Sequence, residues 1–173
     1  KEYYAGRLEL GMPKRISQLP KMIGYQAAGS APLVLGHSVK NPQTRASAIR
    51  IGNPARGDDA KRAVDESYGT FGSVTDEEIE FAYKLIPALE AVSCEYSSAT
   101  PVAGLIKEIQ FSRALARRPI EPFMMYTWYD CDIVCTLTGS IFKDLELAQK
   151  TFTKNPIVID ASYDAVMDVI RSK

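Results

Sequence analysis

Four side chains in this sequence are of the types that bind metal ions through nitrogen or sulfur. They are the single histidine, His37, and the three cysteines, Cys94, Cys131 and Cys135. A zinc site usually needs four converging ligands, but Cys135 lies in a strand-like apolar run and His37 in a loop-like Gly-His-Ser stretch. The sequence therefore predicts no metal site. The odd number of cysteines, without a secretion signal, predicts reduced thiols in a cytoplasmic protein.

A second candidate follows the most strand-like run of the chain, Ile133–Leu137. Its sequence, I-V-C-T-L, is typical of a buried strand in a parallel sheet. The run ends at Thr138 and Gly139. Because ligands in open α/β sheets bind at the carboxyl ends of strands, these two residues mark a candidate binding position.

Arg50 has the side chain best suited to a phosphate group, since a guanidinium binds phosphate through two parallel hydrogen bonds. It belongs to the short apolar stretch Ala46–Ile51, which Asn53-Pro54 ends. In an extended segment successive side chains alternate, so Arg50 would point away from Ile49. We therefore interpret Arg50 as one half of a structural ion pair.

The elements that would position these residues belong to an ordinary globular chain of 173 residues, 46% hydrophobic and 24% charged. Lysine plus arginine and aspartate plus glutamate number 21 each, so no net charge favours nucleic acid or an anionic membrane. No apolar run approaches the roughly 20 residues that span a bilayer. The first residues, K-E-Y-Y-A-G, lack a methionine and are typical of the middle of a longer polypeptide.

Strand and helix patterns alternate along the chain, which indicates an α/β domain with a mostly parallel sheet. Thr75 and Glu78 form a predicted capping box, followed by a buried stripe of Ile79, Ala82, Tyr83, Ile86 and Leu89, with Pro87 expected to kink or end the helix. The predicted strands are 21–29, 69–74, 133–137 and 157–159. Besides the helix from Thr75, the predicted helices are 58–67, 98–110, 143–150 and 163–171. The helix 58–67 would be capped by Asp58 or Asp59, with Ala60, Ala63 and Val64 on one face, and the last helix would bury Ala165, Val166, Val169 and Ile170.

Four segments carry a resemblance to a known family. They are Pro20–Gly36, Ser47–Ala55, Val74–Tyr83, and Leu137–Gly139 with Lys143-Asp144. In this order they resemble the C-terminal half of the threonine synthases, pyridoxal-phosphate enzymes of the fold that includes the tryptophan synthase β subunit. The resemblance extends from about Glu2 to Lys150.

The resemblance implies a fold type II enzyme with a three-layer, mostly parallel sheet flanked by helices. Residues 1–173 would form a single α/β domain, the C-terminal part of the large domain. It also implies the conversion of O-phospho-L-homoserine and water into L-threonine and phosphate by a homo-oligomer. The family's Schiff-base lysine lies in an S-F-K-D context and its cofactor phosphate in a G-N-A-G-N-type loop, and neither occurs in this sequence. We therefore expect no catalytic residue in this chain and a missing N-terminal half or partner chain that supplies the lysine.

Four residues match positions of the family's cofactor pocket. Thr138 matches the residue whose hydroxyl faces the pyridine nitrogen, and a neutral hydroxyl there can donate to an unprotonated ring. Ala48 and Ile49 match an apolar wall beside the ring, although ordinary core packing would use the same residue types. Glu95 matches an acid near the imine side; a helix-start acid favoured by the dipole is the alternative.

Two motifs depart from the family pattern. The family's C-E-P-A-S-A-A is C-E-Y-S-S-A-T at Cys94–Thr100, and its L-T-G-H-G-L-K-D is L-T-G-S-I-F-K-D at Leu137–Asp144. Ile141 replaces a glycine and would strain the loop or change its path. Two alternatives therefore stay open: a related reaction such as cysteate synthesis from phosphoserine and sulfite, or a non-catalytic domain that pairs with a full-length enzyme.

Overall fold

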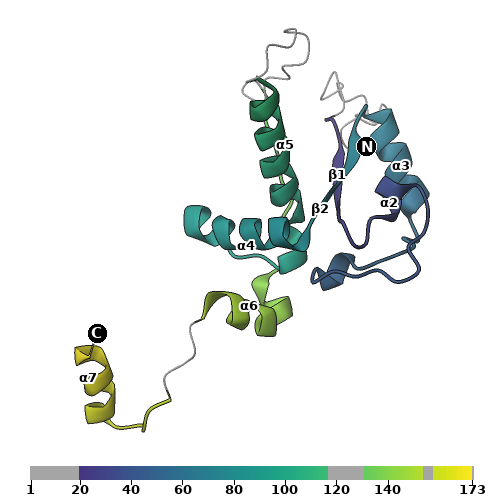
Figure 1. Ribbon diagram of the computed structural model, residues 1–173. Coiled ribbons are helices and arrows are strands. Elements are labelled where there is room, and N and C mark those ends of the chain that lie inside the picture. Colours follow the sequence, from purple (N-terminus) through teal and green to yellow (C-terminus); the bar gives the residue numbers. More distant parts are fainter. Residues whose placement is uncertain (1–19, 117–130, 154–157, 173) are drawn as a thin grey trace, which may run out of the picture.

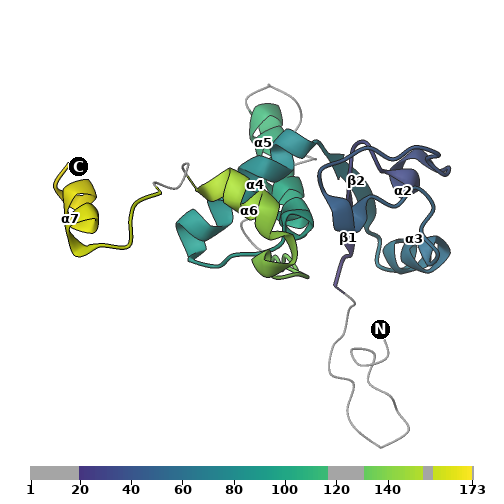
Figure 2. The ribbon, with the colours of Figure 1, turned by 90° about the horizontal axis from the view of Figure 1, so that it is seen from below.

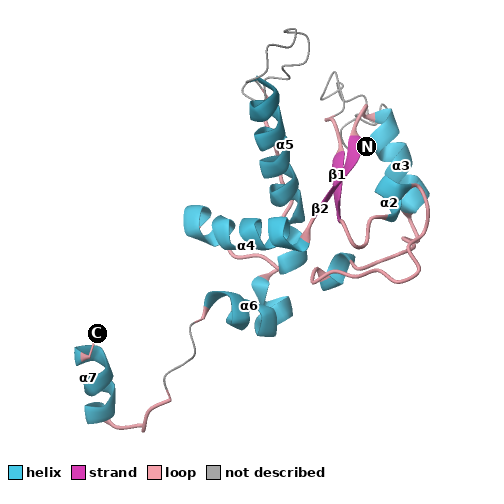
Figure 3. Cartoon of the chain, in the orientation of Figure 1, coloured by secondary structure: helices cyan, strands magenta, loops and turns pink. Residues whose placement is uncertain are grey.

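The computed structural model describes residues 20–116, 131–153 and 158–172 as an arrangement of helices around a small sheet (Figures 1 and 3). The elements in chain order are β1 (Ile23–Ala27), α2 (Pro32–Leu35), the 3₁₀ helix η2 (Ser47–Ile49), α3 (Gly57–Glu66), β2 (Thr70–Val74), α4 (Asp76–Glu90), the 3₁₀ helix η3 (Tyr96–Ala99), α5 (Thr100–Ala116), the 3₁₀ helix η6 (Ile141–Asp144), α6 (Leu145–Phe152) and α7 (Tyr163–Arg171).

The sheet of the described residues has two parallel strands. β1 pairs with β2 in the register Ile23 with Thr70 through Ala27 with Val74. Helices α2 and α3 lie on one side of this pair and α4 and α5 on the other (Figures 1 and 2). The predicted mixed α/β character and both strands before residue 80 are confirmed, whereas the wider three-layer sheet and the single-domain assignment stay predictions.

Helix α4 begins as its sequence predicts. The Thr75 hydroxyl accepts from the Glu78 amide at 3.2 Å, and the Glu78 carboxylate accepts from the Thr75 amide at 2.7 Å. These reciprocal bonds satisfy two of the amides that a helix start leaves without intrahelical partners. Pro87 does not end the helix at once, because α4 continues to Glu90. Leu89, predicted to be buried, is 70% exposed because it follows the part of α4 that packs against η3.

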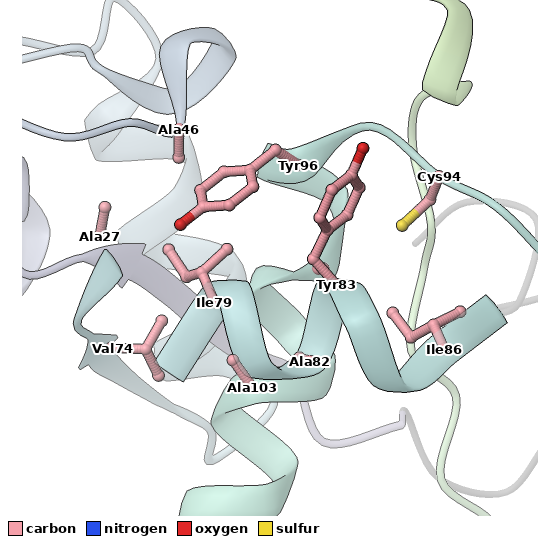
Figure 4. Close-up of a cluster of buried hydrophobic side chains, with 11 residues drawn as sticks. Ala27, Ala46, Val74, Ile79, Ala82, Tyr83, Ile86, Cys94, Tyr96 and Ala103 are labelled. Carbon is pink, nitrogen blue, oxygen red and sulfur yellow. The ribbon is translucent and has the colours of Figure 1, made fainter. Parts of the chain in front are cut away.

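The core of the described residues gathers where α4, η3 and the start of α5 meet (Figure 4). The rings of Tyr83 and Tyr96 meet edge to face with centroids 5.3 Å apart, a favourable aromatic geometry. The Tyr96 hydroxyl donates to the carbonyl of Asp76 at 2.6 Å, so the polar end of this buried ring is satisfied. The cluster consists of Ala27, Ala46, Val74, Ile79, Ala82, Tyr83, Ile86, Cys94, Tyr96, Ala99 and Ala103.

The predicted ends of two helices were wrong. Helix α3 begins one residue earlier than expected, with Arg56 at its N-cap, and Asp58 and Asp59 lie in its first turn. Ala63 is exposed, although Val64 on the predicted face is buried. Helix α5 extends beyond residue 110 to Ala116, and Pro101 lies in its first turn, where its missing amide costs nothing.

The predicted strand Ile133–Leu137 is wrong in this structure. Residues 132–138 have no regular secondary structure, and Val134 is 87% exposed. A strand forms only when a neighbouring strand accepts its backbone hydrogen bonds, and within the described residues the sheet contains only β1 and β2. Strong β-propensity without a partner strand therefore leaves this segment without regular secondary structure.

The last described elements are helical, as predicted. Helix α7 spans Tyr163–Arg171 as expected, but Val166 is 42% and Ile170 60% exposed, so the predicted burial of its apolar face is wrong. The physical reason is its position, because α7 lies away from the other helices in both views (Figures 1 and 2). The predicted connector 113–122 and run 157–159 fall partly outside the described residues. No helix in the described ranges is both long and apolar enough to cross a membrane.

Candidate functional site

The candidate site is built on η3, where two distant segments of the chain meet. Every residue from Cys94 to Thr100 is buried. The Ser97 hydroxyl accepts from the Ala48 amide at 3.2 Å. The neighbouring Ser98 hydroxyl accepts from the Gly139 amide at 2.8 Å and lies 3.0 Å from the Thr138 hydroxyl. Two adjacent serines thus bring the segments 44–49 and 137–140 to one place.

The segment 44–49 is anchored to the start of α4. The amide of Arg45 donates to the Asp76 carboxylate at 2.9 Å, and its guanidinium forms ion pairs with Glu77 and Glu80. The guanidinium also lies 5.7 Å from the centre of the Tyr96 ring, within the range of a cation–π contact. These contacts fix the backbone directly before Ala48.

Residues 47–49 form η2 and are not extended, so the alternation argument applied to Arg50 was wrong. Arg50 is the C-cap of η2, and within the described residues no ion pair involves it. The predicted structural ion pair is therefore not found there. Ala48 is exposed and Ile49 half-buried. Both line a groove of about 240 Å³ together with Gln26, Leu33 and Phe71.

The segment 137–140 is held by η3 from the other side. The Glu95 amide donates to the Gly139 carbonyl at 2.9 Å, next to the Ser98 contacts. Gly139 has no room for a side chain, because a Cβ would lie 2.1 Å from the Glu95 carboxylate. Thr138 itself is exposed. Its hydroxyl contacts the buried Ser98 hydroxyl, while the residue as a whole keeps an exposed surface.

Glu95 is a nearly buried carboxylate in the middle of the site. It is 7% exposed, and Lys143 lies 3.6 Å from its Oε2 atom. Glu95 is the N-cap residue of η3 but makes no capping hydrogen bond with its side chain. Burial, and then the adjacent Glu95, raises the pKa of the Cys94 thiol, so this cysteine is held in its neutral form.

The loop that departs from the family pattern is unstrained. Ile141 begins η6, and among the described residues only Tyr68 and Ala91 have positive φ angles outside glycine. The Ser140 hydroxyl caps η6 by accepting from the Phe142 amide at 3.4 Å. Of the two predicted outcomes for Ile141, strain is therefore wrong.

The structure places three of the four predicted site residues, Thr138, Glu95 and Ala48, around η3. The fourth, Ile49, lines the groove together with Ala48, and its carbonyl accepts from the Ser30 hydroxyl. Sequence reasoning missed Ser97 and Ser98, although both lie in the motif C-E-Y-S-S-A-T. Among the described residues no group of histidine, cysteine, aspartate or glutamate side chains could hold a metal ion.

Comparisons with known proteins show which family this chain belongs to. Residues 5–118 match the family described as pyridoxal-phosphate dependent enzymes. A threonine synthase from Mycobacterium leprae is 41% identical over 92% of this chain and 41% of its own length. Threonine synthases from Synechocystis and Methanosarcina acetivorans are 45% and 37% identical, over 81% and 98% of this chain.

The chain spans about two fifths of the length of the Mycobacterium relative that it matches. That match is long enough to include all three segments of the site. Because the family match covers most of the chain, the chain belongs to the family of pyridoxal-phosphate dependent enzymes.

Proposed function

We propose that this chain is part of a threonine synthase, which converts O-phospho-L-homoserine and water into L-threonine and phosphate. The identities of 37–45% to threonine synthases support this proposal. The observation that carries it is the exposed residue Thr138, whose hydroxyl lies 3.0 Å from the Ser98 hydroxyl and whose neighbour Gly139 bonds to the buried Glu95.

The donor set of the site fits a pyridoxal ring. Pyridoxal phosphate would supply an electron sink for proton removal and phosphate loss. In our proposal Thr138 binds the ring nitrogen, because a neutral hydroxyl can donate to it without protonating it. Gly139, directly after Thr138, lies so close to Glu95 that a Cβ there would be 2.1 Å from the Glu95 Oε2 atom. Glu95 would hold or move a proton near the imine side, and Ala48 and Ile49 would exclude water from one face.

The remainder of the whole enzyme would complete the site and supply the reactive lysine. The apolar segment 133–137 supports this proposal, since it has strand-like composition, pairs with no strand of the described residues and leaves Ile133 and Val134 exposed. We propose a homo-oligomeric enzyme with a phosphorylated amino acid as its substrate. A cytoplasmic location agrees with the buried Cys94 and half-buried Cys135 thiols.

Borohydride reduction of the whole enzyme with bound pyridoxal phosphate tests the proposal. We expect the reduced cofactor on a lysine peptide outside residues 1–173, and a label on a lysine of this chain would contradict the assignment. Phosphate release is then measured with O-phospho-L-homoserine, and with O-phospho-L-serine plus sulfite. Turnover of the second pair alone would favour cysteate synthesis, and cofactor binding without turnover of either would favour a non-catalytic domain.

A further inference from the structure

Ser98 occupies a position from which it can control the proton of the Thr138 hydroxyl. Its side chain is 2% exposed and has two neighbours, the Gly139 amide at 2.8 Å and the Thr138 Oγ1 atom at 3.0 Å. The Gly139 amide can only donate, so it occupies one lone pair of the Ser98 oxygen. What remains on Ser98 is one proton to donate and one lone pair.

Two arrangements of the hydroxyl protons are compatible with the 3.0 Å distance. If Thr138 donated to Ser98, the Ser98 oxygen would accept twice and its own proton would be buried without an acceptor. A buried donor without a partner carries its full desolvation cost. If Ser98 donates to Thr138, every group on Ser98 is satisfied, and the Thr138 proton is free to point outward from an exposed residue.

We propose that Ser98 is a positioning residue that makes Thr138 a hydrogen-bond donor toward the ligand. This inference rests on the proposed function, in which Thr138 faces the pyridine nitrogen. An unprotonated pyridine nitrogen only accepts, so the ring requires the arrangement that burial of Ser98 already favours. The bonds then run in one direction, from Gly139 to Ser98, from Ser98 to Thr138 and from Thr138 to the ring, and each strengthens the next.

Ser97 provides a matched control for this chain of bonds. It lies next to Ser98 on η3, is 6% exposed, and its hydroxyl also accepts from a backbone amide. Its partner is Ala48 on the other segment and not Thr138. Removing either hydroxyl therefore removes a part-buried hydrogen bond from a backbone amide, but only the Ser98 hydroxyl also contacts Thr138.

The test uses the whole enzyme loaded with pyridoxal phosphate that carries ¹⁵N at the ring nitrogen. In Ser98→Ala we expect the ¹⁵N resonance to move toward the value of unprotonated, unbonded pyridine, and the Kd for the cofactor to rise about fivefold to tenfold, as for the loss of one hydrogen bond. Thr138→Val should move the resonance in the same direction and at least as far. Ser97→Ala should leave the resonance in place.

The double variant Ser98→Ala with Thr138→Val separates a positioning role from a general one. If Ser98 acts through Thr138, its removal changes neither the resonance nor the Kd further once Thr138 is valine. An unchanged resonance in Ser98→Ala, or an equal additional change in the Thr138→Val background, would overturn the proposal. If the wild-type enzyme bound no pyridoxal phosphate, the proposed function itself would be overturned. That result differs from a failure of the Ser98 proposal, because the wild type would then show no ¹⁵N resonance of bound cofactor.

A thiol variant covers the case in which Ser98→Ala does not fold. Ser98→Cys fills the same space, but a thiol donates and accepts only weakly. We expect the ¹⁵N resonance to move in the same direction by a smaller amount. A resonance identical to that of the wild type in a folded Ser98→Cys enzyme would equally overturn the role of Ser98.

Discussion

The two segments that meet on η3 are held by different kinds of contact. The segment 44–49 is tied to α4 by the ion pairs of Arg45 and by backbone and side-chain bonds to Asp76. The segment 137–140 is tied to η3 by the Ser98 hydroxyl, which contacts Thr138 and Gly139, and by the Glu95 amide, which donates to the Gly139 carbonyl, while Leu137 packs against the core cluster. The first segment is therefore anchored to both α4 and η3, whereas the long-range hydrogen bonds of the second, among the described residues, reach only η3 and its N-cap Glu95.

Because of this difference, we expect the two segments of the site to respond differently when α4 or η3 is perturbed. A perturbation of α4 should loosen the segment 44–49 and leave 137–140 in place, whereas a perturbation of η3 should loosen both. The amides of Ala48 and Gly139 report on the two segments separately, because each donates to a different serine of η3. Hydrogen exchange at these two amides therefore measures the comparison directly.

The largest effect is expected from Tyr96→Ala, which removes the largest buried side chain of η3, the turn that both segments contact. Tyr96 is 1% exposed, and deleting a buried aromatic ring costs about 3–5 kcal/mol of unfolding free energy. Urea unfolding followed by circular dichroism measures the loss, and exchange should accelerate at Ala48 and Gly139 together. Tyr163→Ala is the control, since Tyr163 is 76% exposed and its loss should change stability by less than about 0.5 kcal/mol.

Two glycine substitutions should separate the segments. A Cβ on Gly29 would lie 1.8 Å from the carbonyl oxygen of Gln43, directly before Thr44, so backbone must move. A Cβ on Gly139 would lie 2.1 Å from the Glu95 Oε2 atom and 3.1 Å from its Cβ, so its close contacts are with a side chain and not with backbone. We expect Gly29→Ala to cost about 3 kcal/mol and Gly139→Ala about 1 kcal/mol, within the range for overpacking.

Exchange measurements assign each glycine effect to its segment. Gly29→Ala should accelerate exchange at Ala48, and Gly139→Ala at Glu95, whose amide donates to Gly139. Equal losses of stability in the two variants would show that the segments are held equally well, and that would contradict the comparison.

The sequence predicted those parts of the fold that depend on neighbouring residues. The Thr75–Glu78 capping box and the bounds of α7 are local patterns, and both are confirmed. The strand at 133–137 depends on a distant partner strand, and its propensity alone could not supply one. Similarly, the apolar stretch 47–49 reads as extended by composition, but its contact with Ser97 and its position after Arg45 shape it into a 3₁₀ turn.

For the candidate site, resemblance to a family predicted Thr138, Glu95, Ala48 and Ile49, a prediction that stays open, but it did not predict the serines that contact Thr138 and Ala48. Ser97 contacts a residue 49 positions away and Ser98 one 40 positions away. Serine in a helix start is usually explained by local capping, so no spacing pattern marks these two. Small neutral residues that act through long-range contacts become visible only in three dimensions.

A smaller effect is expected from Arg45→Met, which keeps the aliphatic stem and removes the charge. The Arg45 side chain is 42% exposed, so its three ion pairs are partly screened, and we expect a loss of about 1 kcal/mol that shrinks with added salt. Exchange should accelerate at Ala48 and not at Gly139. Arg62→Met is the control, because the ion pair of Arg62 with Asp59 lies within α3 and its side chain is 66% exposed. A loss of unfolding free energy in Arg62→Met comparable to that in Arg45→Met would contradict a special role for Arg45.

The smallest effect concerns acid sensitivity of the segment 44–49. The Lys84 ammonium and the Arg45 guanidinium hold the pKa of Glu80 below its usual range. A carboxylate with a lowered folded-state pKa stabilises the protein above its unfolded pKa of about 4.3, and this contribution is lost as the pH falls through the folded value. Protection of the Ala48 amide should therefore decline as the pH is lowered below about 4.3.

Glu80→Gln isolates that contribution, because other carboxylates titrate equally in both proteins. We expect the variant to be less stable than the wild type at neutral pH and the difference to disappear in acid, with Gly139 protection equal in the two throughout. A difference that persists at low pH would mean that Glu80 acts through packing and not through its charge. The segment 44–49 would then not depend on the Glu80 charge, and the contrast between its charged anchor and the hydrogen-bonded anchor of 137–140 would lose its electrostatic part.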